Sequence, residues 1–442
     1  MAPDPAPERS AEDLKAPANS PNVPNFREFE NMEGGDEEES IESLFGDDGS
    51  SQAPIVKIVD LVLMDACRKG ASDIHIEPFE HRVRVRYRVD GHLADALTIP
   101  KKYHSALLAR LKIIANLDIT ENRVPQDGRF KLKIGDKEVD YRLSILPVFW
   151  GGKAVLRSLD KSNLRIHLNE LGFTDRALER FKSAMQKPYG MIIVTGPTGS
   201  GKSTTLYSIV SELNTIQRNI ITVEDPIEYQ LAGITQVQAK PDIGMNFTVA
   251  LKSILRQSPD VVMIGEIRDN DTADIAVKAA LTGQTVLSTL HTNDAVSAIV
   301  RLKNMHVEPF LIAASLNLVA AQRLCRTICE HCKEKKELTQ KELLVLGFDS
   351  TVAELIKKPQ FSRGKGCSRC GRTGMKGRTC ITETLLLDDA IRSMIEKGTP
   401  ASEIKAYAVQ QGMLTLRTDA LLKLAQGLIP IEEVVRVTTM DM

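Results

Sequence analysis

Gly196 to Ser203 read Gly-Pro-Thr-Gly-Ser-Gly-Lys-Ser, after an apolar stretch and before a stretch with helical spacing. This order matches the Walker A pattern, in which backbone N–H groups of a Gly-rich loop surround phosphate oxygens at a helix N-terminus. Lys202 would supply a cation for the outer phosphates, and the Ser203 hydroxyl would ligate Mg²⁺. The sequence therefore predicts an Mg-ATP site that includes Gly196, Pro197, Thr198, Gly199, Ser200, Gly201, Lys202, Ser203 and Thr204.

A second element runs from Asp260 to Asp269, where an apolar strand pattern ends at Glu266. At the end of a strand beside the phosphates, Glu266 would bind Mg²⁺ through water or orient the attacking water, which predicts a catalytic or magnesium-binding role. Arg268 follows two residues later. It fits a place in the nucleotide site and a structural ion pair equally well.

Three carboxylates, Glu224, Asp225 and Glu228, cluster around Pro226 at the end of another apolar stretch. Acidic clusters commonly lie on solvated loops, but this one follows a strand, so we predict catalytic or metal-positioning roles. His291 follows the strand pattern 285–290 and is placed to reach a γ-phosphate. A lone histidine is more often structural, so its position alone leaves both interpretations open.

Six of the seven cysteines lie between residues 325 and 380. Two Cys-x-x-Cys pairs are of the type that closes a tetrahedral zinc site, although the 34 residues between them exceed the usual gap of a compact zinc ribbon. Four thiolates would leave no position for substrate water, so we predict a structural zinc site at Cys329, Cys332, Cys367 and Cys370. Cys67, Cys325 and Cys380 have no such pairing and are expected to be buried thiols.

The surrounding pattern predicts the elements that position these residues. Apolar strands at 191–195, 219–223, 261–264 and 285–290 alternate with helices and end at functional loops, which indicates a mostly parallel sheet. Before them, a helix over 52–69, a helix near 103–115 and strands at 82–89, 130–134, 139–145 and 154–158 predict a small α+β domain. The arginine face of the strand 82–89 is either solvated or a subunit or nucleotide contact.

Charge is distributed unevenly, since residues 1–50 carry 14 Asp and Glu against 3 Lys and Arg, while the remainder has a balance of +10. Such an acidic segment with few large apolar residues predicts disorder. The apolar runs are strand-sized and fall far short of the roughly 20 residues of a membrane-spanning helix. The N-terminus does not resemble a signal peptide either, so we expect a cytoplasmic protein.

Together, these motifs resemble those of the secretion-motor ATPases of type II secretion and type IV pilus assembly. The resemblance covers about residues 53–440. It rests on the nucleotide-site motifs above and on the stretches 71–78, 123–129, 287–293, 322–324 and 436–438, together with the four paired cysteines.

The resemblance implies a PAS-like domain followed by a RecA-like P-loop ATPase core, assembled as a homo-hexamer with ATP bound between domains. It also implies that His291 belongs to the family's histidine box, that Arg142 and Arg157 reach the nucleotide from the preceding domain, and that Arg129 lies beside them. The expected organisation is an acidic tail at 1–50, a PAS-like α+β domain at 52–165, a RecA-like core at 170–325, a zinc subdomain at 326–385 and a helical C-terminal region at 386–442.

In this family the motor acts at the inner membrane on a platform protein, and a membrane protein recruits it. The resemblance therefore implies peripheral membrane association through partners and no nucleic acid. The family's separate N-terminal docking domain is expected to be largely absent, which leaves the partner open. Two rivals remain: a P-loop ATPase that translocates nucleic acid, and a non-catalytic ring scaffold gated by nucleotide.

Overall fold

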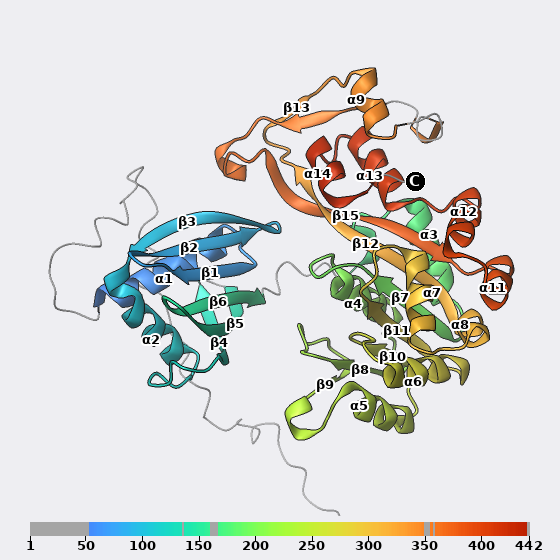
Figure 1. Cartoon of the computed structure of the whole chain (residues 1–442), viewed down its shortest axis with the longest axis horizontal. Helices are drawn as coiled ribbons and strands as arrows, with labels where there is room; N and C mark the ends of the chain where they lie inside the picture. The colour runs from blue at the N-terminus through green and yellow to red at the C-terminus, as the bar shows by residue number, and fades with distance from the viewer. Residues whose placement is uncertain (1–52, 135–136, 160–166, 349–353, 357–358, 440–442) are drawn as a thin grey trace, which may run out of the picture. The chain divides into compact units, whose positions relative to one another are not determined.

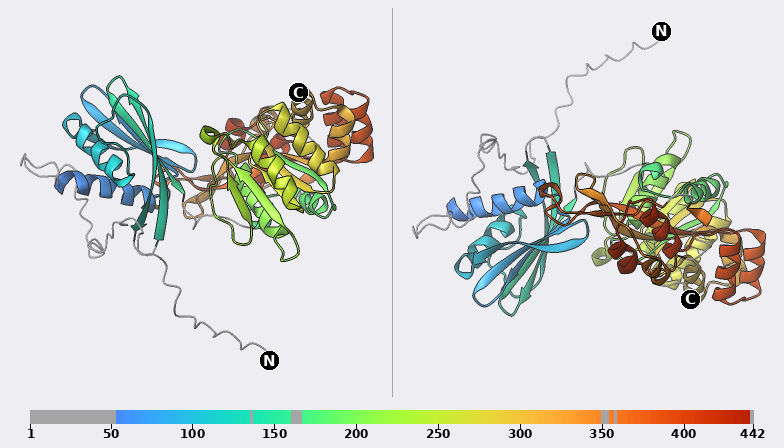
Figure 2. Two further views of the ribbon diagram at one scale, coloured as in Figure 1. Left: turned by 90° about the horizontal axis from the view of Figure 1, so that it is seen from below. Right: turned by 90° about the horizontal axis from the view of Figure 1, so that it is seen from above.

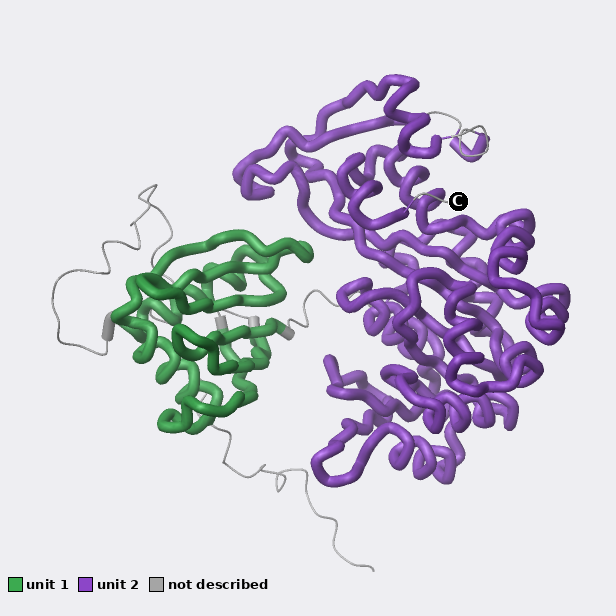
Figure 3. The backbone as a smooth tube through the Cα atoms, viewed as in Figure 1, with its two compact units in different colours: residues 1–161 green, residues 162–442 purple. Residues whose placement is uncertain are grey.

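The computed structural model describes residues 53–134, 137–159, 167–348, 354–356 and 359–439. The predicted acidic tail lies outside these residues. The chain forms two compact units, unit 1 up to Lys161 and unit 2 from Ser162 (Figure 3). Within the described ranges, no helix combines the length and the apolar character needed to cross a bilayer.

Unit 1 is an antiparallel sheet covered by two helices (Figure 1). Its strands have the order β3-β2-β1-β6-β5-β4. The helices α1 and α2 share one hydrophobic core with the apolar side chains of the sheet. The elements are α1 (Ala53–Arg68), β1 (Asp73–Pro78), β2 (Arg82–Val89), β3 (His92–Pro100), α2 (His104–Ile114), β4 (Gln126–Ile134), β5 (Lys137–Val148) and β6 (Gly151–Leu159).

The sequence pattern of unit 1 explains its two faces. Alternation in β1 places Ile74 and Ile76 in the core, and it places Asp73 and Glu77 on the opposite face. There, Glu77 accepts hydrogen bonds from Arg84 and Arg86 of β2. The arginine face of β2 is therefore paired with carboxylates of β1 within its own sheet.

Unit 2 contains a seven-stranded sheet with the order β15-β12-β7-β11-β10-β8-β9. The strands from β12 to β9 are parallel, and β15 pairs antiparallel with β12. The predicted parallel strands are confirmed. The seven strands are β7 (Gly190–Thr195), β8 (Ile220–Glu224), β9 (Thr235–Gln238), β10 (Val261–Ile264), β11 (Thr285–Leu290), β12 (Leu316–Ile328) and β15 (Met375–Leu386).

Helices cover both faces of this sheet (Figure 2). One face packs against α3 (Asp175–Met185) and α4 (Lys202–Leu213). The core of the other face includes side chains of α5 (Phe247–Ile254), α6 (Asn270–Leu281), α7 (Ala295–Asn304), α8 (Pro309–Ser315), α11 (Asp389–Glu396) and α12 (Ala401–Gln410). Because both faces are covered, β7, β10 and β11 are rich in apolar residues and are buried along their whole length.

The outer ends of β12 and β15 carry a smaller region with its own core. It contains β13 (Lys333–Lys335), α9 (Gln340–Val345), β14 (Ser362–Gly364), α13 (Leu416–Ala425) and α14 (Ile431–Val437). The buried Glu433 of α14 binds Arg326 of β12, and the buried pair Asp419–Lys423 of α13 binds the backbone of β15. Residues 326–385 thus include β15, a strand of the main sheet.

Candidate nucleotide site and tetracysteine cluster

The loop between β7 and α4 is shaped by glycines. Gly196, Gly199 and Gly201 have φ angles of 149°, 79° and 88°, a region that side chains disfavour. A methyl group on Gly196 would also lie only 2.5 Å from the carbonyl oxygen of Gln322. The loop therefore needs glycine at its first position, both for its conformation and for its close approach to β12.

Lys202 is the first residue of α4, and its ammonium group lies within the loop. Its Nζ donates to the carbonyl oxygens of Gly196 at 2.8 Å and Pro197 at 3.1 Å. Burial lowers the pKa of Lys202, although the charge of Glu266 opposes that effect. Ser200 Oγ is buried without a hydrogen-bond partner among the described residues, whereas Ser203 is exposed. This is the arrangement of a loop built to receive an anion.

Glu266 and His291 follow the neighbouring strands β10 and β11, and β11 pairs in turn with β7. Nε2 of His291 lies 3.4 Å from Oε2 of Glu266, and Arg268 donates a hydrogen bond to Oε1. Burial alone would raise the pKa of Glu266. The hydrogen bond from Arg268 and the charges of Arg268, His291 and Lys202 outweigh burial, so the pKa lies below its ordinary value.

Glu224, at the end of β8, is buried and well bonded. Tyr207 of α4 donates to Oε2, while Thr222 at 2.6 Å and Gln236 at 3.0 Å donate to Oε1. Tyr207 also accepts a hydrogen bond from the backbone N–H of Glu228. Glu224 therefore ties the acidic loop to the helix that follows the Gly-rich loop. Asp225 is exposed beside it, and Glu228 is half-buried.

Arg129, Arg142 and Arg157 lie in unit 1, whereas the Gly-rich loop lies in unit 2. Within unit 1 they occupy one row across three strands, since Arg142 of β5 is directly opposite both Arg129 of β4 and Arg157 of β6. Nε of Arg157 donates to Asp73 at 3.0 Å. Like charges placed directly opposite each other destabilise a sheet. An anion bound to this row would offset that cost.

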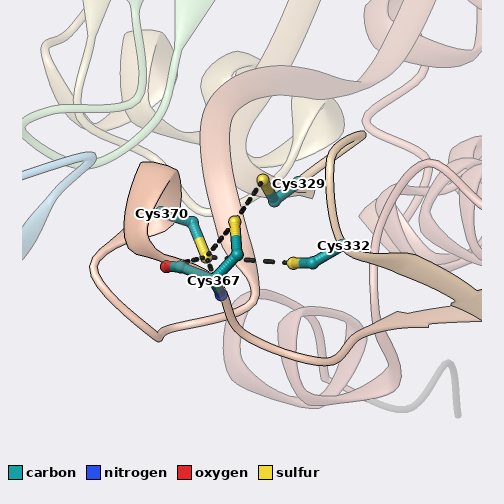
Figure 4. Close-up of side chains that lie close together, drawn as sticks. All are labelled: Cys329, Cys332, Cys367 and Cys370. Carbon is teal, nitrogen blue, oxygen red and sulfur yellow. Dashed lines mark hydrogen bonds between the residues drawn. The ribbon is translucent and has the colours of Figure 1, made fainter.

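The four paired cysteines converge from two loops, and their sulfurs point toward one another (Figure 4). The Sγ atoms lie 3.9 Å apart in the pairs Cys329–Cys367 and Cys332–Cys370, and 3.7 Å apart in Cys367–Cys370. A tetrahedron of thiolates about 2.3 Å from a zinc ion has S···S edges of about 3.8 Å, so the spacing fits that metal.

Hydrogen bonds support the thiolate form of one member of this cluster, Cys370. Burial would raise the pKa of Cys370, but the backbone N–H groups of Cys367 and Gly374 donate to its sulfur and lower the pKa to about 6. Burial raises the pKa of Cys332 to about 11. Cys325 and Cys380 are buried as predicted, whereas Cys67 is only partly buried, because it lies near the exposed end of α1.

Residues to which the sequence analysis assigned no role of their own complete the site. Thr195 at the end of β7 accepts a hydrogen bond from the N–H of Thr292, which links the Gly-rich loop to the loop of His291. Gln322 and Arg323 reach the site from β12. A signal was present, because this polar pair ends the apolar run 318–321.

A parallel sheet with a Gly-rich phosphate loop after one strand and a glutamate after another defines the RecA-like class of P-loop proteins. The chain belongs to the type II/IV secretion system protein family, whose model matches residues 48–436.

The proteins similar to the chain include pilus and secretion ATPases and proteins of solved structure. The type IV pilus assembly ATPase PilB of Myxococcus xanthus (strain DK1622) is 50% identical over 89% of this chain and 69% of its own length. The type II secretion system ATPase E of Vibrio cholerae serotype O1 is 48% identical over 88% and 76%. The pilus retraction motor PilT with bound ADP is 26% identical with a TM-score of 0.58, covering 87% of this chain and 97% of PilT. The Legionella pneumophila ATPase DotB has a TM-score of 0.63 at 22% identity, covering 86% and 95%, and shows likeness of fold alone.

Proposed function

We propose that this protein is a motor that hydrolyses Mg-ATP and uses the energy to assemble a type IV pilus or a type II secretion pseudopilus. One observation carries the proposal: Lys202, Glu266 and His291 follow three successive parallel strands, β7, β10 and β11, at one edge of the sheet. The names of the two relatives, a pilus assembly ATPase and a secretion system ATPase, support filament assembly as the process that hydrolysis drives.

In this proposal the Gly-rich loop from Gly196 to Thr204 binds the phosphates through its backbone, Ser200 and Lys202. Ser203 and Glu266 would hold Mg²⁺, which neutralises phosphate charge when bound. Glu266 is ionised at neutral pH and orients the attacking water, and His291 senses the γ-phosphate. Glu224 acts with Glu266 in placing water and metal, while Asp225, Glu228 and Arg268 complete the polar rim.

We propose that the arginine row binds nucleotide phosphates. The row belongs to unit 1, the domain that precedes the ATPase core, and consists of Arg129, Arg142 and Arg157. Phosphate contacts from two domains would hold them closed, and hydrolysis would release that contact. The unfavourable pairing of like charges within the row supports a role in anion binding.

We infer that the cysteine cluster holds zinc. Four thiolates saturate a tetrahedral ion, so the metal would fold the region between β12 and β15 and take no part in hydrolysis.

The working assembly in this proposal is a homo-hexamer on the cytoplasmic side of the inner membrane. It would be attached there by a recruiting protein and would act on a membrane platform protein. Nucleic acid has no role in it.

Steady-state phosphate release with Mg-ATP tests this function, using the wild type, Lys202→Ala and Glu266→Gln, each with and without DNA. We expect both variants to lose at least about a hundredfold in turnover, because each removes a group that stabilises the transition state. Glu212→Gln, a change at an exposed position of α4, should keep full turnover.

Full turnover by either site variant would contradict the assignment, and strong stimulation by DNA would favour a nucleic-acid translocase. Nucleotide-dependent oligomers without turnover would favour the scaffold.

A further inference from the structure

Two consecutive residues of β12, Gln322 and Arg323, lie beside the Gly-rich loop, and Gln322 is bonded to it directly. Nε2 of Gln322 donates to the carbonyl oxygen of Ser200 at 2.9 Å, and its Oε1 accepts from Thr205 of α4 at 2.8 Å. Gln322 is buried, so these bonds are protected from water. The side chain of Gln322 thus fixes the loop backbone against α4, and both of its polar atoms are hydrogen-bonded.

Arg323 makes a different set of contacts. Its Nη2 donates to the carbonyl oxygen of Asn293 at 2.8 Å, and its Nη1 donates to that of Gln322 at 3.0 Å. A methyl group on Gly196 would lie 3.1 Å from Nη1. Since β12 and β11 flank β7, the guanidinium spans the end of β7 where the phosphate loop begins. Asn293 follows His291 by two residues, so Arg323 also holds the loop that carries His291.

Within the described part of the chain, the charge of Arg323 is not balanced by an ion pair. Its hydrogen bonds go to neutral oxygens, and Asp294 and Glu383 act on it only through their charge. Burial lowers the pKa of Arg323, and the charges of Asp294 and Glu383 oppose that effect. Both carboxylates already accept hydrogen bonds from the first turn of α7. A half-buried guanidinium gains most from an anionic acceptor.

Lys202 lies close enough to be affected by this charge. Burial lowers the pKa of Lys202, and the positive charge of Arg323 lowers it further. The positive charges of Lys202 and Arg323 repel each other beside one loop. A polyanion that binds there stabilises both charges.

We propose that Arg323 belongs to the nucleotide site: its charge attracts the nucleotide phosphates, and its bond to Asn293 positions the loop of His291. This inference rests on the proposed ATP site. It adds a cation from the strand that continues into the cysteine cluster, on the side of β7 opposite β11.

Three variants of the full-length protein separate charge from position. Arg323→Gln removes the charge, Arg323→Lys keeps the charge but loses the forked guanidinium, and Arg326→Gln removes an arginine of the same strand that pairs with Glu433 instead. Dissociation constants for Mg-ADP and a non-hydrolysable Mg-ATP analogue, kcat and KM would be measured for each. Lys202→Ala is the reference for the loop itself.

We expect Arg323→Gln to weaken binding of the ATP analogue about tenfold and of ADP less, because the analogue carries more negative charge. Arg323→Lys should bind within about threefold of the wild type but lose roughly tenfold in kcat, because the bridge to Asn293 is lost. Arg326→Gln should bind nucleotide as the wild type does.

Binding by Arg323→Gln within twofold of the wild type would overturn the charge role, and an unchanged kcat in Arg323→Lys would overturn the positioning role. If Arg323→Gln does not fold, Arg323→Met replaces it as the uncharged variant, and binding within twofold of the wild type would overturn the charge role in the same way, while Arg323→Lys still tests the positioning role. If Lys202→Ala also binds as the wild type, the ATP site itself is wrong. If only Lys202→Ala loses binding, the site stands and Arg323 is outside it.

Discussion

Nε2 of His291 lies 3.4 Å from Oε2 of Glu266, and the two residues follow neighbouring parallel strands. Arg268 donates to the other carboxylate oxygen, so Glu266 lies between two groups that favour its charged form. The pKa of Glu266 is lowered by these partners even though burial opposes them. The carboxylate therefore stays charged to a lower pH than an ordinary glutamate does.

Arg268→Ala should raise the pKa of Glu266, because burial is then opposed only by His291 and Lys202. A raised pKa means that Glu266 becomes protonated at a higher pH. The acid limb of the pH profile of kcat/KM should therefore move upward compared with the wild type. Arg256→Ala, which removes an exposed arginine bonded to the backbone of Lys252, is the control. An unmoved acid limb in Arg268→Ala would separate Arg268 from the ionisation of Glu266.

Purified protein should contain about one zinc per chain, measured by elemental analysis. Cys329→Ser should lose the metal, because three thiolates and a hydroxyl bind zinc far more weakly, and the region between β12 and β15 should then unfold at a lower temperature. Cys67→Ser, in unit 1, should keep both zinc and stability. Full zinc content in Cys329→Ser would exclude the four-cysteine site.

The strands that carry the predicted site residues could be recognised from the sequence because each is a short apolar run that ends at polar residues. β12 and β15 were harder to recognise. Their buried polar residues, among them Gln322 and Glu383, interrupt the apolar pattern, and the groups that satisfy them lie far away in the sequence. The bond between Glu224 and Tyr207 was likewise invisible, because it depends on how α4 packs beside β8.

Glu433→Gln should lower the free energy of unfolding of unit 2 by about 3 kcal/mol, because Glu433 is buried between Arg326 and Arg436, which would lose their carboxylate. Partners lower the pKa of Glu433 against the effect of burial. Its stabilisation is thus full above the unfolded-state pKa and is lost as the pH falls through the folded-state pKa.

Urea unfolding at pH 7 and at lower pH measures the free energies of unfolding of the wild type and Glu433→Gln. The difference between these two free energies should narrow as the pH falls. Glu432→Gln, a change at the exposed neighbouring residue, should unfold like the wild type. Equal stability of the wild type and Glu433→Gln at pH 7 would show that the ion pairs contribute nothing.

Arg142→Gln should stabilise unit 1 and weaken nucleotide binding. Arg142 lies directly opposite two other arginines, and cross-strand pairs of like charge cost up to about 1 kcal/mol each. Removing the central charge should raise the free energy of unfolding by about 0.5 kcal/mol. The same change should raise KM for Mg-ATP about tenfold if the row binds phosphate.

The opposite signs of these two effects identify a functional residue. Replacing a side chain that is kept for packing makes the protein less stable. Replacing one that is kept for binding at the expense of the fold makes the protein more stable. Arg82→Gln, at an exposed position of β2 opposite Pro100, should change neither quantity. A loss of stability in Arg142→Gln would indicate a structural role, and an unchanged KM would remove Arg142 from the nucleotide site.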